Sequence, residues 1–194
     1  YTHGYGAVVS PVNRVNAQEQ PEFYVRDISP TGSSSLQITR PQIYYGEQTG
    51  QFAIVNTRER EFDRPATAAV SGTEEYTRYT GAAGVPIGSL PNRLVFAAAF
   101  GDINILLSGS LTGDSQILYH RAIADRVQRI APFLTLDHDP YMVILDGKLI
   151  WIQDAYTATE RFPYSTRASD LGPNGDFNYI RNSVKATVDA YDGS

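Results

Sequence analysis

The sequence has no cysteine among its 194 residues, and it has only three histidines, one methionine and one tryptophan. Without cysteine the chain has no disulfide scaffold, no thiol nucleophile and no thiolate ligand for a metal. Serine-type catalysis needs a histidine beside an orienting acid, and only His3, His120 and His138 can supply the imidazole. The sequence also lacks a GxGxxG pattern, a Walker loop and an HExxH pattern. No complete catalytic or nucleotide-binding motif is present, and no cofactor is expected.

Long hydrophobic runs are missing as well. The longest uninterrupted run covers residues 94–100 and stops at Gly101 and Asp102, whereas a membrane-spanning helix needs about 20 apolar residues. No signal peptide is recognisable, and both ends resemble cuts made in a longer protein. The net charge of −5 leaves no basic footprint for nucleic acid or for anionic lipid. We therefore expect no nucleic-acid partner and no membrane insertion by this piece.

The residues that are present are those of an ordinary globular protein. Hydrophobic residues make up 42% of the chain and charged residues 19%. A chain of this length forms one domain, so residues 1–194 are expected to be a single soluble domain. Thirteen tyrosines suit half-buried sheet faces and polar-edged surfaces.

The first half of the chain predicts short strands joined by loops. Alternating or β-branched runs favour strands at residues 7–9, 23–28, 36–39, 42–45 and 51–56. Residues 57–92 are rich in glycine and proline and are interpreted as one long loop. A loop of that length inside a compact domain is usually functional, as a binding loop or a lid over a sheet edge.

Three segments predict helices. Pro91 suits a first helical turn, and residues 94–100 are apolar on every face, so a helix there should be largely buried. Asp114 is a candidate N-cap for a second helix. The apolar stripe of that helix would be Tyr119, Ile123, Val127 and Ile130. The same spacing at Ile180, Val184, Val188 and Tyr191 predicts a third helix, ended by Gly193.

A β-hairpin is predicted between the second and third helices. Asp146 and Gly147 fit a type I′ turn between strands at residues 141–145 and 149–153. Side chains alternate along a strand, so Ile150 and Ile152 are expected on the core face and Trp151 on the opposite face. Strands, helices, a hairpin and a helix in this order predict an α+β fold, with a mainly antiparallel sheet and about three helices.

Several polar and aromatic residues are candidates for a functional site. Asp137 and Asp139 flank His138 and are candidate ligands for a hard cation, although the same residues suit a solvated turn. Paired carboxylates carry out glycoside hydrolysis, for which the catalytic candidates are Asp102, Asp137, Asp139 and Asp154. Aromatic side chains near loops bind sugars or partner proteins, or are simply half-buried. The candidates of this kind are Tyr76, Tyr79, Trp151 and Tyr156.

Taken together, a series of short segments resembles a known family. The segments are YTHGYG (1–6), SPVN (10–13), IYYGE (43–47), IVNT (54–57), EFD (61–63), YTRY (76–79), FGD through LLS (100–108), APF (131–133), Asp137 through Pro140 and Tyr141, WIQDAYT (151–157) and NYIRNSVK (178–185). Read in this order, the chain resembles the large bacterial membrane proteins of uncharacterised protein family 0182.

The resemblance implies a topology rather than a chemistry. Members of that family carry several membrane spans near the N-terminus, followed by a large soluble region outside the cytoplasm. This chain is expected to be a piece of that extracytoplasmic region, belonging to a parent protein in the cell membrane. The family has no established activity, substrate or catalytic residue that could be carried over to this sequence.

Two functions are compatible with these observations. The first is a non-enzymatic module that binds or scaffolds an envelope partner or the remainder of the parent membrane protein. The second is a carboxylate-dependent hydrolase acting on envelope glycans. Two carboxylates converging in an aromatic-lined pocket would favour the hydrolase, and aspartates dispersed over caps and turns would favour the module. Homo-oligomerisation is left open.

Overall fold

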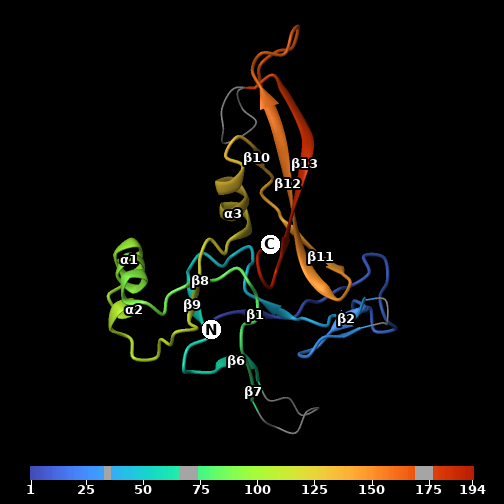
Figure 1. The fold of residues 1–194 in the computed structure, drawn as a ribbon. Coiled ribbons are helices and arrows are strands. Elements are labelled where there is room, and N and C mark those ends of the chain that lie inside the picture. Colours follow the sequence, from blue (N-terminus) through green and yellow to red (C-terminus); the bar gives the residue numbers. More distant parts are fainter. Residues whose placement is uncertain (33–35, 66–73, 169–176) are drawn as a thin grey trace.

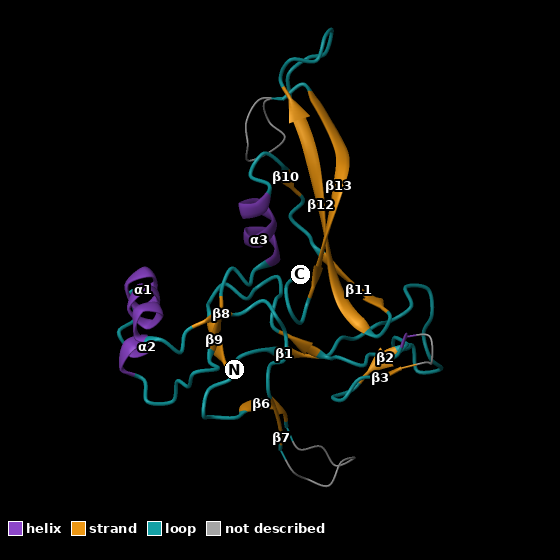
Figure 2. Ribbon diagram, in the orientation of Figure 1, coloured by secondary structure: helices purple, strands orange, loops and turns teal. Residues whose placement is uncertain are grey.

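The computed structural model describes residues 1–32, 36–65, 74–168 and 177–194, and it has the predicted α+β architecture with antiparallel sheets (Figures 1 and 2). The helices of these residues are α1 (Leu90–Phe100), α2 (Asn104–Leu107) and α3 (Ile123–Ile130). None of them is long and apolar enough to cross a membrane. Ser89 caps α1, and Pro91 lies in its first turn as predicted.

The body of the molecule is built from very short strands connected by loops (Figure 2). Two-stranded ladders join β1 (Gly4–Tyr5) to β4 (Gln42–Ile43), β2 (Val25–Arg26) to β3 (Thr31–Gly32), and β6 (Glu61–Arg64) to β7 (Glu75–Thr77). A three-stranded sheet places β9 (Gln116–Leu118) between β5 (Ala53–Val55) and β8 (Val85–Pro86).

A four-stranded sheet forms the other half of the molecule. Its central strand, β12 (Lys148–Thr159), pairs with β13 (Tyr179–Asp189) on one side. On the other side it pairs with β11 (Tyr141–Leu145) and β10 (Thr135–Leu136). The far ends of β12 and β13 extend beyond the body as a two-stranded arm (Figure 1). Asp146 and Gly147 have φ values of 49° and 77°, so the predicted type I′ hairpin is confirmed.

The principal core joins the two halves. It contains Tyr44, Tyr45 and Tyr79 from the loop-rich part, Ile123 and Val127 from α3, and Val188 with Tyr191 from the end of the four-stranded sheet. The ring of Tyr44 lies edge-on to Tyr79 and Tyr191, with centroids 4.7 and 5.2 Å away. Such aromatic pairs add to the stabilisation that burial of the rings supplies.

Two of the predicted helices are wrong in position or type. Residues 180–188 form most of β13, because β12 offers them a ladder over almost their whole length. Non-local pairing of this kind overrides a helical spacing of apolar residues. Asp114 caps no helix, since residues 116–118 form β9 and α3 begins only at Ile123. Tyr119 therefore precedes the helix, and Ile130 at its end is exposed.

Other local expectations also need correction. The segment 57–92 contains β6, β7 and β8 rather than one uninterrupted loop, and part of it, residues 66–73, lies outside the described residues. Residues 36–39 form no strand, and in residues 7–9 only Val9 makes a β-bridge. The helix around residues 94–100 exists, but only Ala97 of α1 is buried.

The core face of β12 is the reverse of the predicted one. Leu149, Gln153 and Ala155 are buried, and Trp151 shares their face, whereas Ile150 and Ile152 lie on the outer face. The reason is tertiary: Leu149 packs with Val25, Ile38 and Ala190. Trp151 is half-buried and packs against two core clusters.

Candidate functional site

The outer face of the four-stranded sheet brings three of the predicted site residues together. Here Asp137, Tyr141, Asp154, Tyr156 and Lys185 form a group that we call the sheet-face cluster. The Tyr156 hydroxyl donates a hydrogen bond of 2.6 Å to Asp137 Oδ2. The Lys185 ammonium forms an ion pair with Asp154 and lies 3.3 Å from the Tyr141 hydroxyl. Strand register places these groups side by side, because Asp154 is directly opposite Lys185.

Hydrogen bonds within the sheet-face cluster favour a charged Asp137, a neutral Tyr156 and a charged Lys185. Hydrogen bonds from the Tyr156 hydroxyl and from the backbone of Asp139 hold the pKa of Asp137 below its usual value. The same bond to Asp137 raises the pKa of the Tyr156 phenol. The bond to Asp154 raises the pKa of Lys185. A general acid for glycoside hydrolysis needs a raised carboxyl pKa, so Asp137 is poorly tuned for that role.

The remaining carboxylate candidates, Asp102 and Asp139, lie in turns between elements. Asp102 lies between α1 and α2, where its Oδ1 accepts hydrogen bonds of 2.9 Å from both the backbone and the side chain of Asn104. Asp139 is exposed, and its backbone N–H donates to Asp137 Oδ1 over 3.0 Å. The segment 137–139 therefore closes a turn between β10 and β11, as the alternative interpretation of these residues expects.

A shallow pocket of about 400 Å³ lies between α3 and β10, lined by Ala124, Asp125, Gln128, Thr135, Leu136, Asp137 and His138. The carboxylate of Asp125 already accepts hydrogen bonds from His120 Nδ1 at 2.9 Å and Arg129 Nε at 3.0 Å. Within the described residues, no group of three or more His, Asp or Glu side chains is arranged to hold a metal ion. A cation at Asp137 and Asp139 stays a prediction from the sequence.

The four aromatic candidates occupy different environments. Tyr76 of β7 is exposed, and its hydroxyl donates to Glu74 over 2.8 Å. Tyr79 is buried in the principal core. The Trp151 indole N–H donates to the Tyr45 carbonyl over 3.0 Å. Tyr156 belongs to the sheet-face cluster. These residues do not form one aromatic surface, because they lie on opposite faces or in separate elements.

The densest polar group was missed by the sequence interpretation. Thr2, His3, Tyr44, Glu61 and Asp63 form what we call the buried network, which ties the N-terminal segment to β4 and β6. Glu61 accepts hydrogen bonds from the Thr2 hydroxyl at 2.9 Å, the Tyr44 hydroxyl at 2.8 Å and the Tyr79 backbone N–H at 3.1 Å. His3 Nε2 lies 3.2 Å from Asp63 Oδ1, which also accepts from Gln42.

Arg121 carries the positive charge beside this network. It is buried, and its guanidinium donates to the backbone carbonyls of Tyr44 at 2.6 Å, Gln51 at 3.3 Å and Thr2 at 2.6 Å. One side chain therefore joins three segments that are far apart in the sequence. Because an arginine has five N–H donors in a planar fork, it suits such multiple contacts to carbonyl groups.

Within the buried network, a hydroxyl, an imidazole and a carboxylate follow one another, as in nucleophilic hydrolases. The Thr2 hydroxyl lies 2.9 Å from His3 Nδ1. The Glu61 carboxylate, however, competes for the hydroxyl proton of Thr2 at the same distance. The His3 side chain has an exposed fraction of 0%. This arrangement leaves the imidazole without access to a substrate, and the group acts as a structural brace.

Burial dominates the protonation of His3. Loss of water lowers the pKa of His3 from its ordinary 6.5, although Asp63 and Glu61 raise it, and Arg121 lowers it further. The neutral ring carries its proton on Nε2, since the Asp63 carboxylate can only accept. Burial and the Glu61 carboxylate likewise raise the pKa of the Tyr44 phenol, which stays neutral.

We expect the stability of the chain to fall as the pH drops below about 6.5, because the unfolded chain then binds a proton that folded His3 resists. The measurement is the urea midpoint between pH 7.5 and 5, followed through Trp151 fluorescence. The variant His3→Gln should show a flatter pH dependence over this range. The carboxyl of Asp137, whose pKa is lowered from 3.8, titrates below this window. Equal slopes for the parent chain and the variant would contradict the assignment.

One sequence signal could have revealed the buried network. In an extended segment Glu61 and Asp63 share a face, and the apolar Phe62 lies between them on the other. The segment 58–61 alternates in charge, a pattern typical of an exposed surface segment. Burial of its last residue depends on Thr2 and Tyr44, which lie 59 and 17 positions away along the chain.

Comparison with known proteins identifies the family but no activity. The model of the uncharacterised protein family UPF0182 matches residues 1–194. Proteins named "UPF0182 protein" are 48% identical in Pelotomaculum thermopropionicum and 51% identical in Sulfurovum sp. (strain NBC37-1), in each case over the whole chain. A protein of the same name in Methanospirillum hungatei is 51% identical over 197 residues.

The chain spans about a fifth of the length of these relatives, covering 20% of the first and 21% of the other two. No solved structure matches it significantly. The chain is thus a fragment of a larger protein, and it belongs to the uncharacterised protein family UPF0182.

Proposed function

We propose that this chain is a non-enzymatic interaction module in the extracytoplasmic region of a larger membrane protein, and that it docks onto the rest of its parent through α1 and α2. A single observation carries the proposal. The most apolar helical segment, α1, is left largely uncovered by the residues that the structure describes.

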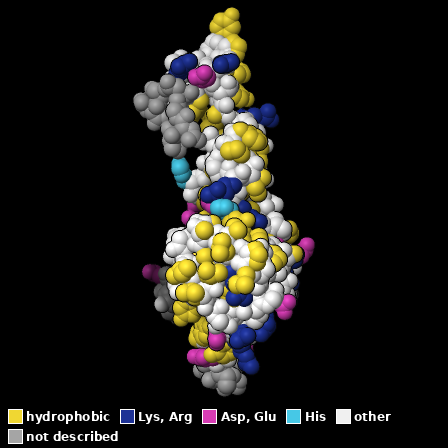
Figure 3. Space-filling view, turned by 60° about the vertical axis from the view of Figure 1, so that its left-hand side comes forward, with side chains coloured by type: hydrophobic (Ala, Val, Ile, Leu, Met, Phe, Trp, Pro, Cys, Tyr) yellow, Lys and Arg dark blue, Asp and Glu magenta, His cyan; other side chains and the backbone are white. Residues whose placement is uncertain are grey.

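The surface concerned consists of six large apolar side chains, which we call the helical apolar surface. Their exposed fractions are 69% for Leu90, 60% for Leu94, 61% for Val95, 38% for Phe100, 58% for Ile103 and 72% for Leu107. Hydrophobic side chains gather on the face that carries α1 and α2 (Figure 3). Isolated exposed leucines need no explanation, but a group of this size on adjoining helices marks an interaction site.

Charge is almost absent from this part of the chain. Residues 90–107 contain only two charged side chains, Arg93 and Asp102. The guanidinium of Arg93 donates to the carbonyls of Ile87 and Leu111, each at 3.3 Å. The Asp102 carboxylate is bonded to Asn104. Depletion of charge at the centre of a patch is typical of a protein interface.

Only part of the apolar surface of α1 is buried against the rest of the described chain. Ala97 is buried and Phe96 is partly buried in a small cluster with Ile87, Ile105 and Ile117. An all-round apolar helix is expected to be covered on every side. About four-fifths of the length of the relatives lies outside the chain, and that remainder is the partner available in every molecule.

The glycan-hydrolase alternative finds less support in the geometry. Asp102 organises the start of α2, Asp137 closes a turn and Asp154 pairs with Lys185. Asp137 and Asp154 share the sheet-face cluster, but the Tyr156 hydroxyl and Lys185 already engage them, and Asp102 lies apart between α1 and α2; this arrangement favours a module.

Footprinting with a small radical reagent tests the proposal. We expect Leu94, Val95 and Leu107 to be labelled strongly in the isolated chain and several-fold less in the full-length parent. Ile105 is buried within this chain and should stay unlabelled in both proteins, which makes it the control. The double variant Leu94→Ser, Leu107→Ser should change the stability of the isolated chain by less than about 0.5 kcal/mol per site. In the full-length parent, the same variant should restore labelling of Val95.

Equal labelling of these residues in the isolated chain and in the parent would contradict the docking proposal. Protection that appears in the isolated chain as its concentration rises would identify a second copy as the partner instead, and would also overturn the proposal.

A further inference from the structure

The outer edge of β13 is a second recognition feature, independent of the helical apolar surface. In the described part of the chain β13 pairs only with β12, although it has 11 residues. An unpaired strand edge presents a row of N–H and C=O groups that can bind another strand. In Figure 1 this edge runs along the arm, away from α3 and β10.

The ladder shows which backbone groups point outward. Ala190 donates to Leu149 over 2.9 Å and so faces β12, whereas Asp189 donates outward to Ser194 over 2.9 Å. Neighbouring residues alternate in this respect along an antiparallel strand, and the ladder is regular from Val184 to Asp189, after the bulge at Ser183. Lys185 and Thr187, opposite Asp154 and Ile152, therefore direct their N–H and C=O groups away from β12.

Solvent reaches this edge over most of its length. Residues 179–183, 185 and 187 are exposed, and only the last part of β13 is buried. The turn ending at Ser194 occupies the outward position at Asp189. A strand added at this edge would have the outward positions up to Thr187 available.

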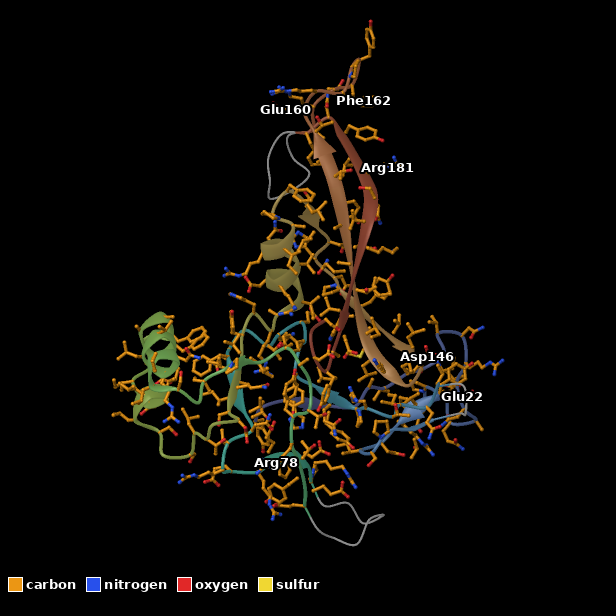
Figure 4. The ribbon with its side chains drawn as sticks, in the orientation of Figure 1. Glu22, Arg78, Asp146, Glu160, Phe162 and Arg181 are labelled. Carbon is orange, nitrogen blue, oxygen red and sulfur yellow. The ribbon has the colours of Figure 1, made fainter. Side chains whose placement is uncertain are left out.

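The basic side chains of β13 favour an incoming strand that carries acidic residues. The strand carries Arg181 and Lys185, and it has no acidic residue before Asp189. Arg181 has no ion pair among the described residues, and it lies on the arm below Glu160 and Phe162 (Figure 4). A second copy bound at this edge would bring together two strands that each carry Arg181 and Lys185 and no acidic residue before Asp189. Like charges on neighbouring strands destabilise a ladder.

We propose that the outer edge of β13 binds an extended, acidic segment of the parent protein from outside this chain, which adds a strand to the sheet. Backbone hydrogen bonds to Lys185 and Thr187 supply the binding, and an acidic side chain near Arg181 supplies the selection, since Lys185 is already paired with Asp154. This is the recognition mode of domains that extend a sheet with a partner strand.

Residue-resolved hydrogen exchange on the isolated chain and on the full-length parent tests this proposal. The outward amides of Lys185 and Thr187 should exchange at least about tenfold more slowly in the parent. The inward amides of Ala186 and Val188 should be protected in both proteins, as an internal control.

Proline at an outward position blocks strand addition without removing a bond to β12. Thr187→Pro should restore fast exchange of the Lys185 amide in the parent, and Thr187→Ala should leave it slow. If the proline variant does not fold, Arg181→Glu replaces it, since this exposed change repels an acidic strand and should also speed exchange.

Equal exchange of the outward amides in both proteins would overturn the proposal. Slow exchange in the isolated chain that grows with concentration would show pairing with a second copy and would overturn it as well. Neither β13 variant should alter the labelling of Leu94 or Leu107, so the two docking surfaces are tested separately.

Discussion

Replacing Glu61 with alanine is expected to lower the free energy of unfolding by about 2–6 kcal/mol, because two buried donors lose their acceptor. The Glu61 carboxylate accepts from Thr2, Tyr44 and the backbone of Tyr79. Alanine would leave the hydroxyl of Tyr44 and the N–H of Tyr79 buried without this acceptor. Each orphaned group costs about 1–3 kcal/mol.

Urea denaturation followed by Trp151 fluorescence measures this loss. Glu59→Ala is the matched control, because Glu59 is exposed two positions away. We expect the control to change stability by no more than about 0.5 kcal/mol. Similar midpoints for the two variants would show that the buried network does not brace the fold.

Replacing Arg121 with methionine is expected to destabilise the chain by at least about 3 kcal/mol, since it removes three hydrogen bonds from a charged group and such bonds contribute about 1.5–3 kcal/mol each. Methionine keeps much of the packing volume but removes the donors to the carbonyls of Tyr44, Gln51 and Thr2. The N-terminal segment should lose its anchor first. Hydrogen exchange in residues 1–6 should therefore accelerate under conditions in which α3 remains protected.

Arg129→Met is the control for this prediction. Arg129 lies on the surface of α3 and pairs with Asp125, four residues earlier. Exposed pairs of this kind contribute about 0–1 kcal/mol. If the two arginine variants lose equal stability, Arg121 does not have the bridging role that its three carbonyl contacts indicate.

Together these predictions separate the stability of the chain from its docking. The buried network and Arg121 hold the N-terminal segment, β4 and β6 together, and none of these groups belongs to the helical apolar surface or to β13. Variants at the two docking surfaces should therefore leave the isolated chain folded, while Glu61→Ala and Arg121→Met should weaken it without any partner present.

The features that the sequence alone determined are those decided within a few residues. Asp146 and Gly147 supply the positive φ values of a type I′ turn, and the hairpin forms where they stand. Pro91 in the first turn marks the start of α1. Both depend on backbone conformations that a residue type favours by itself, whatever lies elsewhere in the chain. The α+β class and the family resemblance were also readable at this level.

Only the tertiary structure decided whether a spacing of apolar residues formed a helix or a strand, and which side chains were buried. The apolar spacing of Ile180, Val184 and Val188 suits a helix, but the ladder with β12 makes this segment a strand. Glu61 is buried because Thr2 and Tyr44 reach it from distant positions. The largely apolar α1 stays exposed because the described residues leave its outer side uncovered. Burial and strand pairing depend on contacts between segments that are far apart in the sequence, so no short stretch of sequence determines them.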